Sequence, residues 1–139
     1  MRKLLIITFV FCGLFAFHNA NAQCDSTTNM CQKHLGTEYV SDGQVYRALL
    51  NGDETAEFHA TFFGGATYRI VGGSGVSEGN LIFSIYDIEN NLLFTNNDHK
   101  NNPYWDFEFS STINCRIEGQ LDALGEASGC AVLLIGFKR

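Results

Sequence analysis

The sequence predicts an all-β fold, an antiparallel, jelly-roll-like β-sandwich of about eight strands in residues 44–139. From Gln44 onward, short runs rich in aromatic and β-branched residues alternate with clusters of Gly, Asn and Asp at regular intervals. That spacing is typical of sandwiches and barrels. Two runs add detail, because residues 104–110 alternate cleanly between apolar and polar side chains and residues 131–135 are apolar throughout.

Eight segments fit the strand pattern. In chain order they are 44–50, 56–63, 67–71, 81–87, 92–95, 104–110, 113–119 and 130–137. The turn sequence Asn51-Gly52-Asp53 predicts a hairpin between the first two strands. Gly64-Gly65, the glycine-rich stretch 72–80 and Glu89-Asn90-Asn91 separate the next strands.

Alternation assigns faces to two of the strands. Trp105, Phe107 and Phe109 share one side of their strand and are expected in the core, although a platform that stacks a sugar is a rival interpretation for Trp105. Leu81, Phe83 and Ile85 are expected to face inward as well. The last strand is expected in mid-sheet, because a strand apolar on both sides is covered on both faces.

Residues 1–22 read as a secretory signal peptide. Arg2 and Lys3 form a basic start, residues 4–17 are almost wholly apolar, and Ala20-Asn21-Ala22 offers the small residues of a cleavage site. The apolar run is shorter than the roughly 20 residues that span a bilayer. We therefore expect a secreted or periplasmic protein that begins near Gln23 and has no membrane span in its mature form.

Four cysteines, Cys24, Cys31, Cys115 and Cys130, remain after the predicted cleavage. An even number in an exported chain predicts two disulfides. The favoured pairs are Cys24 with Cys31 and Cys115 with Cys130. In the alternative, both N-terminal cysteines bond to Cys115 and Cys130. The segment that carries the first two cysteines, 23–43, shows no firm periodicity and is expected to be a loop with at most a short helical turn.

The mature chain has seven Lys and Arg against fifteen Asp and Glu, a net charge of −8. Such a surface repels nucleic acid and anionic lipid, so neither is expected as a partner. It suits a neutral ligand, a cation or a basic partner, although acidity that serves solubility alone is the simpler interpretation.

No motif indicates an enzyme. Gly72-Gly73-Ser74-Gly75 lacks the last glycine of a nucleophile elbow, because Val76 follows. His34, His59 and His99 are scattered, and His59 is expected to be exposed or capped by a hydrogen bond. Asp106 and Glu108 share a strand face, where Arg47, Arg69 and Arg116 of other strands could pair with them.

One loop is a candidate binding site. Its polar side chains and the aromatic residue after it are Asn96, Asn97, Asp98, Asn101, Asn102 and Tyr104. Loops at an end of a sandwich commonly bind ligands, and amide and carboxylate oxygens suit Ca²⁺ or a glycan. No other cofactor is indicated.

Two strand and turn motifs resemble those of a known family. The run Phe62-Phe63-Gly64-Gly65-Ala66-Thr67-Tyr68-Arg69-Ile70-Val71 and the later strand ending in Tyr86-Asp87 before a polar turn resemble bacterial pre-peptidase C-terminal domains. The resemblance covers about residues 45–137. It implies a secreted β-sandwich accessory module, a type usually fused to an enzyme, and transfers no site residue.

The sequence thus predicts a non-enzymatic, exported binding module for a glycan or a protein at the cell envelope or outside the cell. The alternative is a structural or assembly component of the envelope. It would associate through sheet surfaces such as Ile82 and Tyr86.

Overall fold

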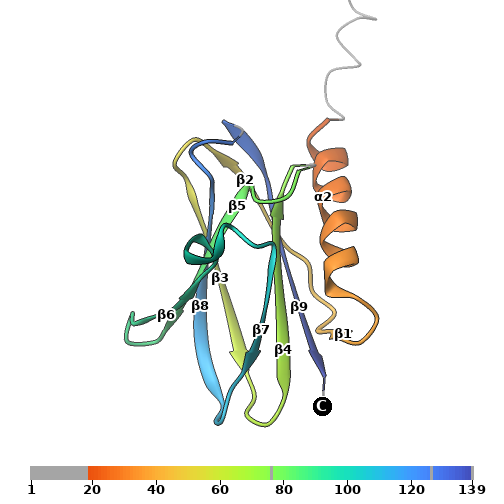
Figure 1. Ribbon diagram of the computed structural model, residues 1–139. Helices are drawn as coiled ribbons and strands as arrows, with labels where there is room; N and C mark the ends of the chain where they lie inside the picture. Colours follow the sequence, from red (N-terminus) through yellow and green to blue (C-terminus); the bar gives the residue numbers. More distant parts are fainter. Residues whose placement is uncertain (1–18, 76, 126, 139) are drawn as a thin grey trace, which may run out of the picture.

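A helix covers one face of a two-sheet sandwich (Figure 1). The computed structural model describes residues 19–75, 77–125 and 127–138, and side chains from Gln23 onward. Most of the expected signal peptide, residues 1–18, lies outside the described residues. Among the described helices, none is long and apolar enough to cross a membrane.

The strands confirm the predicted antiparallel β-sandwich. Helix α2 spans Asn19–Leu35, and the strands are β1 (Val40–Ser41), β2 (Tyr46–Asn51), β3 (Thr55–Phe62), β4 (Thr67–Ser74), β5 (Leu81–Asp87), β6 (Leu92–Thr95), β7 (Tyr104–Glu108), β8 (Ile113–Leu121) and β9 (Ser128–Lys138). A short 3-10 helix, η2 (Asn96–His99), follows β6. All eight expected strands are present, and β5 and β6 have the expected bounds.

The strand order is that of a jelly roll. One sheet, here the β9 sheet, has the order β2-β9-β4-β7, with β1 also paired to β9. The other, the β8 sheet, has the order β3-β8-β5-β6. From β2 onward, each connection between described strands crosses from one sheet to the other, except the β5–β6 hairpin.

The predicted hairpin between the first two strands is wrong. β2 pairs with β9 and β3 pairs with β8, so the Asn51-Gly52-Asp53 turn is a corner between the two sheets. A tight turn reverses the chain in either arrangement. The local turn sequence therefore could not specify whether the flanking strands pair.

The expected loop at 23–43 is also wrong, because it contains most of α2 and all of β1. The residues of α2 that face the sheet are Cys24, Thr27, Thr28, Cys31 and Leu35. Their spacing is helical, but four of the five are small or polar, so the apolar stripe that marks an amphipathic helix is weak.

Two glycines of the β9 sheet let α2 lie close to it. A Cβ at Gly73 would lie 2.8 Å from the Cys31 sulfur, and a Cβ at Gly136 would lie 2.6 Å from a methyl group of Leu35. With α2 on one face and the β8 sheet on the other, Gly129 to Gly136 of β9 are all buried. This confirms the prediction of a central last strand.

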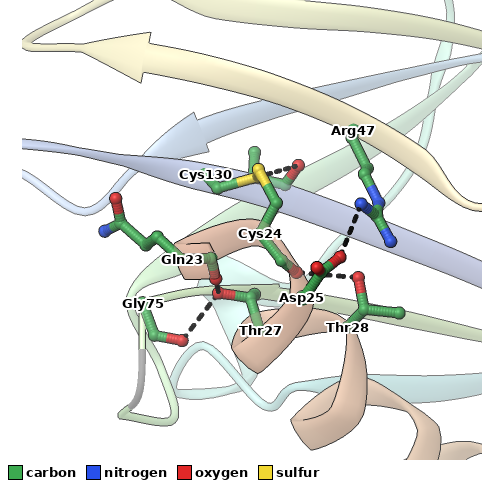
Figure 2. The surroundings of a disulfide bond; sticks show 9 residues. Gln23, Cys24, Asp25, Thr27, Thr28, Arg47, Gly75 and Cys130 are labelled. Atoms are coloured by element: carbon green, nitrogen blue, oxygen red, sulfur yellow. Dashed lines mark hydrogen bonds and ion pairs between the residues drawn. A yellow bond between two sulfur atoms is a disulfide. The ribbon is translucent and has the colours of Figure 1, made fainter. Parts of the chain in front are cut away.

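A disulfide joins Cys24 of α2 to Cys130 of β9, with 5.2 Å between their Cα atoms (Figure 2). Both favoured pairs are therefore wrong. Cys24 and Cys31 lie seven residues apart on one helix, a separation of about 10 Å that a disulfide cannot bridge. The alternative in which the N-terminal segment is tied to the end of the chain is right for Cys24 and Cys130 only.

Cys31 and Cys115 are free and buried, in different layers. Cys31 packs between α2 and the β9 sheet. Cys115 lies on β8 in the core between the two sheets. The expected second disulfide is therefore absent from the structure.

The core between the sheets contains Leu133 and Ile135 of β9 and, from the β8 sheet, the expected Phe83 and Ile85. Leu81 is buried in an adjoining cluster. Phe107 and Phe109 pack against the main core but remain half-buried. Trp105 is also half-buried, because β7 is an edge strand, and its ring lies 4.2 Å from that of His99.

Candidate functional site

The first candidate site is a cleft between the two sheets at the β2 and β3 edge. We call it the Phe63 cleft. It has a volume of about 680 Å³, and its mouth lies between residues Asp42 to Tyr46 on one side and the end of β3 with Phe63 on the other. Ile135 and Phe137 of β9 line it from behind.

An outward bulge of the β9 sheet forms one wall of the cleft. Ser41 pairs with Gly136 and Tyr46 pairs with Leu133, so four residues on one strand oppose two on the other. The extra residues leave the sheet at Asp42, and Gly43 adopts a left-handed φ of 85°. An insertion of this kind bends the strand away from its partner, which opens the sandwich here.

A glycine turn forms the opposite wall. Gly65 has a φ of 84° and donates its N–H to the carbonyl oxygen of Phe109 at 3.1 Å. A Cβ at Gly64 would lie 2.9 Å from Cα of Ser111, so only glycine allows this approach. The Phe63 N–H donates to the hydroxyl oxygen of Tyr68 at 2.9 Å. These contacts hold Phe63 at the rim, where the residue is 62% exposed.

The floor of the cleft is apolar and its mouth is acidic. Phe62, Tyr68 and Ile135 are buried core residues that form the floor. At the mouth, the Tyr46 hydroxyl donates to a carboxylate oxygen of Asp42 at 3.3 Å. Burial and the neighbouring Asp42 carboxylate raise the pKa of Tyr46, so this hydroxyl stays protonated at neutral pH.

The titratable side chains that line the cleft are Asp42, His59 and the two tyrosines Tyr46 and Tyr68. His59, exposed as expected, has its Nε2 2.8 Å from a carboxylate oxygen of Glu57. Among the described residues, no group of three His, Cys, Asp or Glu side chains lies close enough to hold a metal ion. An apolar side chain fits the floor, and Asp42 offers an acceptor to a cation or hydroxyl at the mouth.

The loop at residues 96–102, which the sequence predicted as a binding site, does not line the Phe63 cleft. Its residues have several different roles. Asn96 is fully buried: it accepts the Phe83 N–H at 2.8 Å and donates to the carbonyl oxygens of Leu81 and Asn102. It therefore braces β5 against the loop. Both amide hydrogens of Asn96 are used, and its complete burial keeps the side chain from a ligand.

Other residues of the loop are likewise engaged. Asn101 donates to the carbonyl oxygen of Gly79 and to the carboxylate of Asp122. The Tyr104 N–H donates to the Asn102 side chain at 3.4 Å. Asn97 and Asp98 are exposed. Binding of Ca²⁺ or a glycan by this loop stays a prediction.

The Tyr104 ring lies on the α2 side of the β9 sheet, in a cluster centred on Arg69. The Arg69 guanidinium lies between the Tyr39 ring at 4.4 Å and the Tyr104 ring at 4.6 Å. It donates to both carboxylate oxygens of Asp106, at 2.7 and 2.9 Å, and to the carbonyl oxygen of His34. The proposed pairing of Asp106 with an arginine is confirmed for Arg69.

Arg69 holds the pKa of the Asp106 carboxyl below its usual range. Its own hydrogen bond to Asp106 raises the pKa of Arg69. The other two arginines pair elsewhere, Arg47 with Asp25 of α2 (Figure 2) and Arg116 with Glu118. The Arg69 cluster uses its donors internally and fastens the end of α2 to the sheet.

Sequence reasoning did not find the Phe63 cleft. The Gly64-Gly65 turn was visible in the sequence, but the bulge at Asp42 depends on where β1 and β2 pair with β9.

The outer face of the β8 sheet is the surface that the sequence suggested for assembly. Its residues Ile82 and Tyr86 are half-buried, and the Arg116 guanidinium lies 4.6 Å from the Tyr86 ring.

Comparison with known proteins gives a fold likeness. No protein-family model matches the chain, and no curated protein matches it. A similar solved structure is the crystal structure of PliG from Aeromonas hydrophila, a periplasmic lysozyme inhibitor of g-type lysozyme. The likeness has a TM-score of 0.52 at 12% sequence identity, and covers 68% of this chain and 85% of that one. At this level of identity, the likeness shows a shared fold alone.

Proposed function

We propose that this chain is a non-enzymatic module that acts in the periplasm or after secretion and binds a protein through the Phe63 cleft. The observation that carries the proposal is the cleft itself. A phenylalanine that is 62% exposed is held at the rim by backbone contacts, above a floor of buried core residues. An exposed aromatic residue beside an apolar hollow is the usual composition of an interface centre.

The chemistry favours a basic protein as the partner. The mature chain has a net charge of −8, and Asp42 and Glu57 lie at or beside the cleft. Complementary charge speeds association and selects among partners, while an inserted apolar side chain supplies the affinity.

The location outside the cytoplasm is supported by the disulfide. Cys24 and Cys130 form a covalent bond, and such bonds persist in oxidising compartments. The signal peptide predicted at residues 1–22 points the same way.

The fold likeness supplies a first partner to test. PliG shares the fold and is an inhibitor of g-type lysozyme, a protein ligand bound by a non-enzymatic protein. Fold alone does not transfer a partner, so lysozyme enters here as the first probe. Glycan binding at the 96–102 loop and the pre-peptidase C-terminal resemblance remain secondary predictions, as does assembly through Ile82 and Tyr86.

The experiment compares three proteins as inhibitors of g-type lysozyme: the chain from Gln23 onward, its Phe63→Asp variant and its Leu124→Asp variant. Leu124 is 95% exposed in the β8–β9 turn, at the opposite end of the sandwich, so it is the matched control. Inhibition by the parent and the control, lost on Phe63→Asp, supports the proposal with lysozyme as the partner. Equal inhibition by all three would place binding outside the cleft. If none inhibits, g-type lysozyme is not the partner.

A further inference from the structure

Strand β3 borders the Phe63 cleft, and among the described strands only one of its two edges is paired. Its eight residues pair with β8 without interruption, from Thr55 with Gln120 to Phe62 with Ile113. Among the described strands, no other pairs with β3. The strand also lacks the proline, lysine and bulge by which natural edge strands block further pairing.

Two hollows flank the same stretch of β3. Residues 59–61 line the Phe63 cleft on the inner side. They also line a second hollow of about 540 Å³ on the outer side, which Ile88, Asn114 and Arg116 border. A strand added beside β3 would direct its side chains alternately to these two sides. The inner hollow lies at the free edge itself. The outer hollow continues over β8, on the paired side of β3, so only a long side chain of an added strand reaches across β3 to it.

The two hollows select different side chains. The inner one has the apolar floor of Phe62, Tyr68 and Ile135. Asp87 and Arg116 line the outer one. Arg116 is already paired with Glu118 and lies 3.8 Å from Glu57, so carboxylates outnumber guanidinium groups among the described residues around this hollow. Hydrogen bonds from Asn91 lower the pKa of Asp87, so its carboxylate is ionised at neutral pH.

We propose that the partner contributes an extended segment that adds to the free edge of β3 as a fifth strand, with apolar side chains in the Phe63 cleft and Lys or Arg side chains over the acidic outer hollow. This rests on the proposed protein-binding function and names the way in which the partner is bound. Main-chain pairing supplies affinity in this mode, and the alternate side chains supply specificity.

The test uses an eight-residue peptide of alternating Leu and Lys, the length of β3. The measurement is amide hydrogen exchange of the full mature chain, followed by NMR. Exchange is expected to slow by about tenfold or more at every second amide of β3, because only alternate N–H groups point to the free edge. Control peptides are a block arrangement of the same residues and an alternating Leu and Glu peptide. No slowing, or equal slowing by the block peptide, overturns the proposal.

Two proline variants supply the second measurement. Adjacent residues of a strand direct their N–H groups to opposite sides, so one of His59→Pro and Ala60→Pro removes a bond to β8, and the other removes only a donor at the free edge. The variant that retains the parent melting temperature should lose binding of the alternating peptide by about tenfold or more. Unchanged peptide binding by that variant overturns strand addition.

The Phe63→Asp variant tests protein binding by the cleft separately from strand addition. If a protein partner is lost on Phe63→Asp but retained by the stable proline variant, the cleft binds proteins and strand addition is wrong. If Phe63→Asp changes nothing, the proposed function fails and the inference fails with it.

Discussion

Cys24 in the first turns of α2 is covalently bonded to Cys130 near the start of β9, 106 residues further along the chain. The pair lies in a buried contact between α2 and the β9 sheet. Near it, Thr27 donates to the carbonyl oxygen of Gly75, and Arg47 pairs with Asp25 (Figure 2). The helix is thus fixed to the sheet that also supplies the back of the Phe63 cleft.

Removing this bond should lower stability strongly. A crosslink that closes a loop of this length stabilises by up to about 5 kcal/mol in the chain-entropy account. We expect Cys24→Ser to lower the free energy of unfolding by about 3 to 5 kcal/mol in denaturant titrations, with the β-sheet circular dichroism signal retained at low denaturant. A loss below about 0.5 kcal/mol would contradict this role.

The native protein should contain two free thiols, of Cys31 and Cys115, that are inaccessible to reagents. Burial raises the pKa of Cys31 to about 12 and raises that of Cys115, so neither is a thiolate at pH 8. Thiol titration of the mature chain without reductant should detect almost no reaction in the native state and two thiols after denaturation. No thiols after denaturation would mean that a second disulfide exists.

The close approach of α2 can be tested at Gly73. A methyl group there would meet the Cys31 sulfur at 2.8 Å and the terminal carbon of Met30 at 3.1 Å. We expect Gly73→Ala to destabilise by about 1 to 3 kcal/mol, with much of the loss recovered when Cys31→Ala makes room. The control is Gly119→Ala, where the nearest atom is 3.8 Å away and the effect should be smaller. Equal effects at the two glycines would contradict the packing.

Asn96 should behave as a structural residue. Asn96→Ala would leave the Phe83 N–H and the Leu81 carbonyl oxygen without their partner in a buried site. We expect a loss of about 3 kcal/mol in unfolding free energy, against less than about 0.5 kcal/mol for the exposed Asn97→Ala. If Asn96→Ala left stability unchanged, the assignment of Asn96 to bracing β5 would be wrong.

Stability should depend on pH through Asp106. Because Arg69 lowers the folded-state pKa of Asp106, the stabilisation is complete above the unfolded value of about 3.9 and is lost as pH falls through the lowered folded value. With the pair part-exposed, Asp106→Asn should cost about 1 kcal/mol at pH 7. The difference from the parent should shrink below about pH 4 in melting curves. A difference that is constant from pH 7 to pH 2 would contradict this assignment.

Much of the sandwich could be predicted because the order of apolar and polar residues along a strand reflects which of its faces are buried. The alternation at Phe83 and Ile85 and the unbroken apolar run from Ala131 placed two strands correctly. The pairing at the Asn51-Gly52 corner could not be predicted, because partners are chosen among distant strands. Helix α2 was not predicted because its buried face is made mostly of Cys and Thr, although Gly36 and Lys33 at its end are helix-end signals in the sequence.

The candidate site was the least predictable part. Asn96 has the polarity of a ligand-binding residue, and only its burial reveals a structural role. The Phe63 cleft arises from a mismatch in strand register at Asp42 and from the turn at Gly64, and these meet only in three dimensions.

The most direct test of the protein-binding cleft places a photo-crosslinking amino acid at position 63 of the mature chain, with position 124 as the control. The chain is exposed to the exported proteins of its own cell, and crosslinked products are identified by mass spectrometry. We predict one basic protein crosslinked from position 63, saturable by unlabelled parent chain and absent from position 124. Products that are identical from both positions, or none from position 63, would contradict the account.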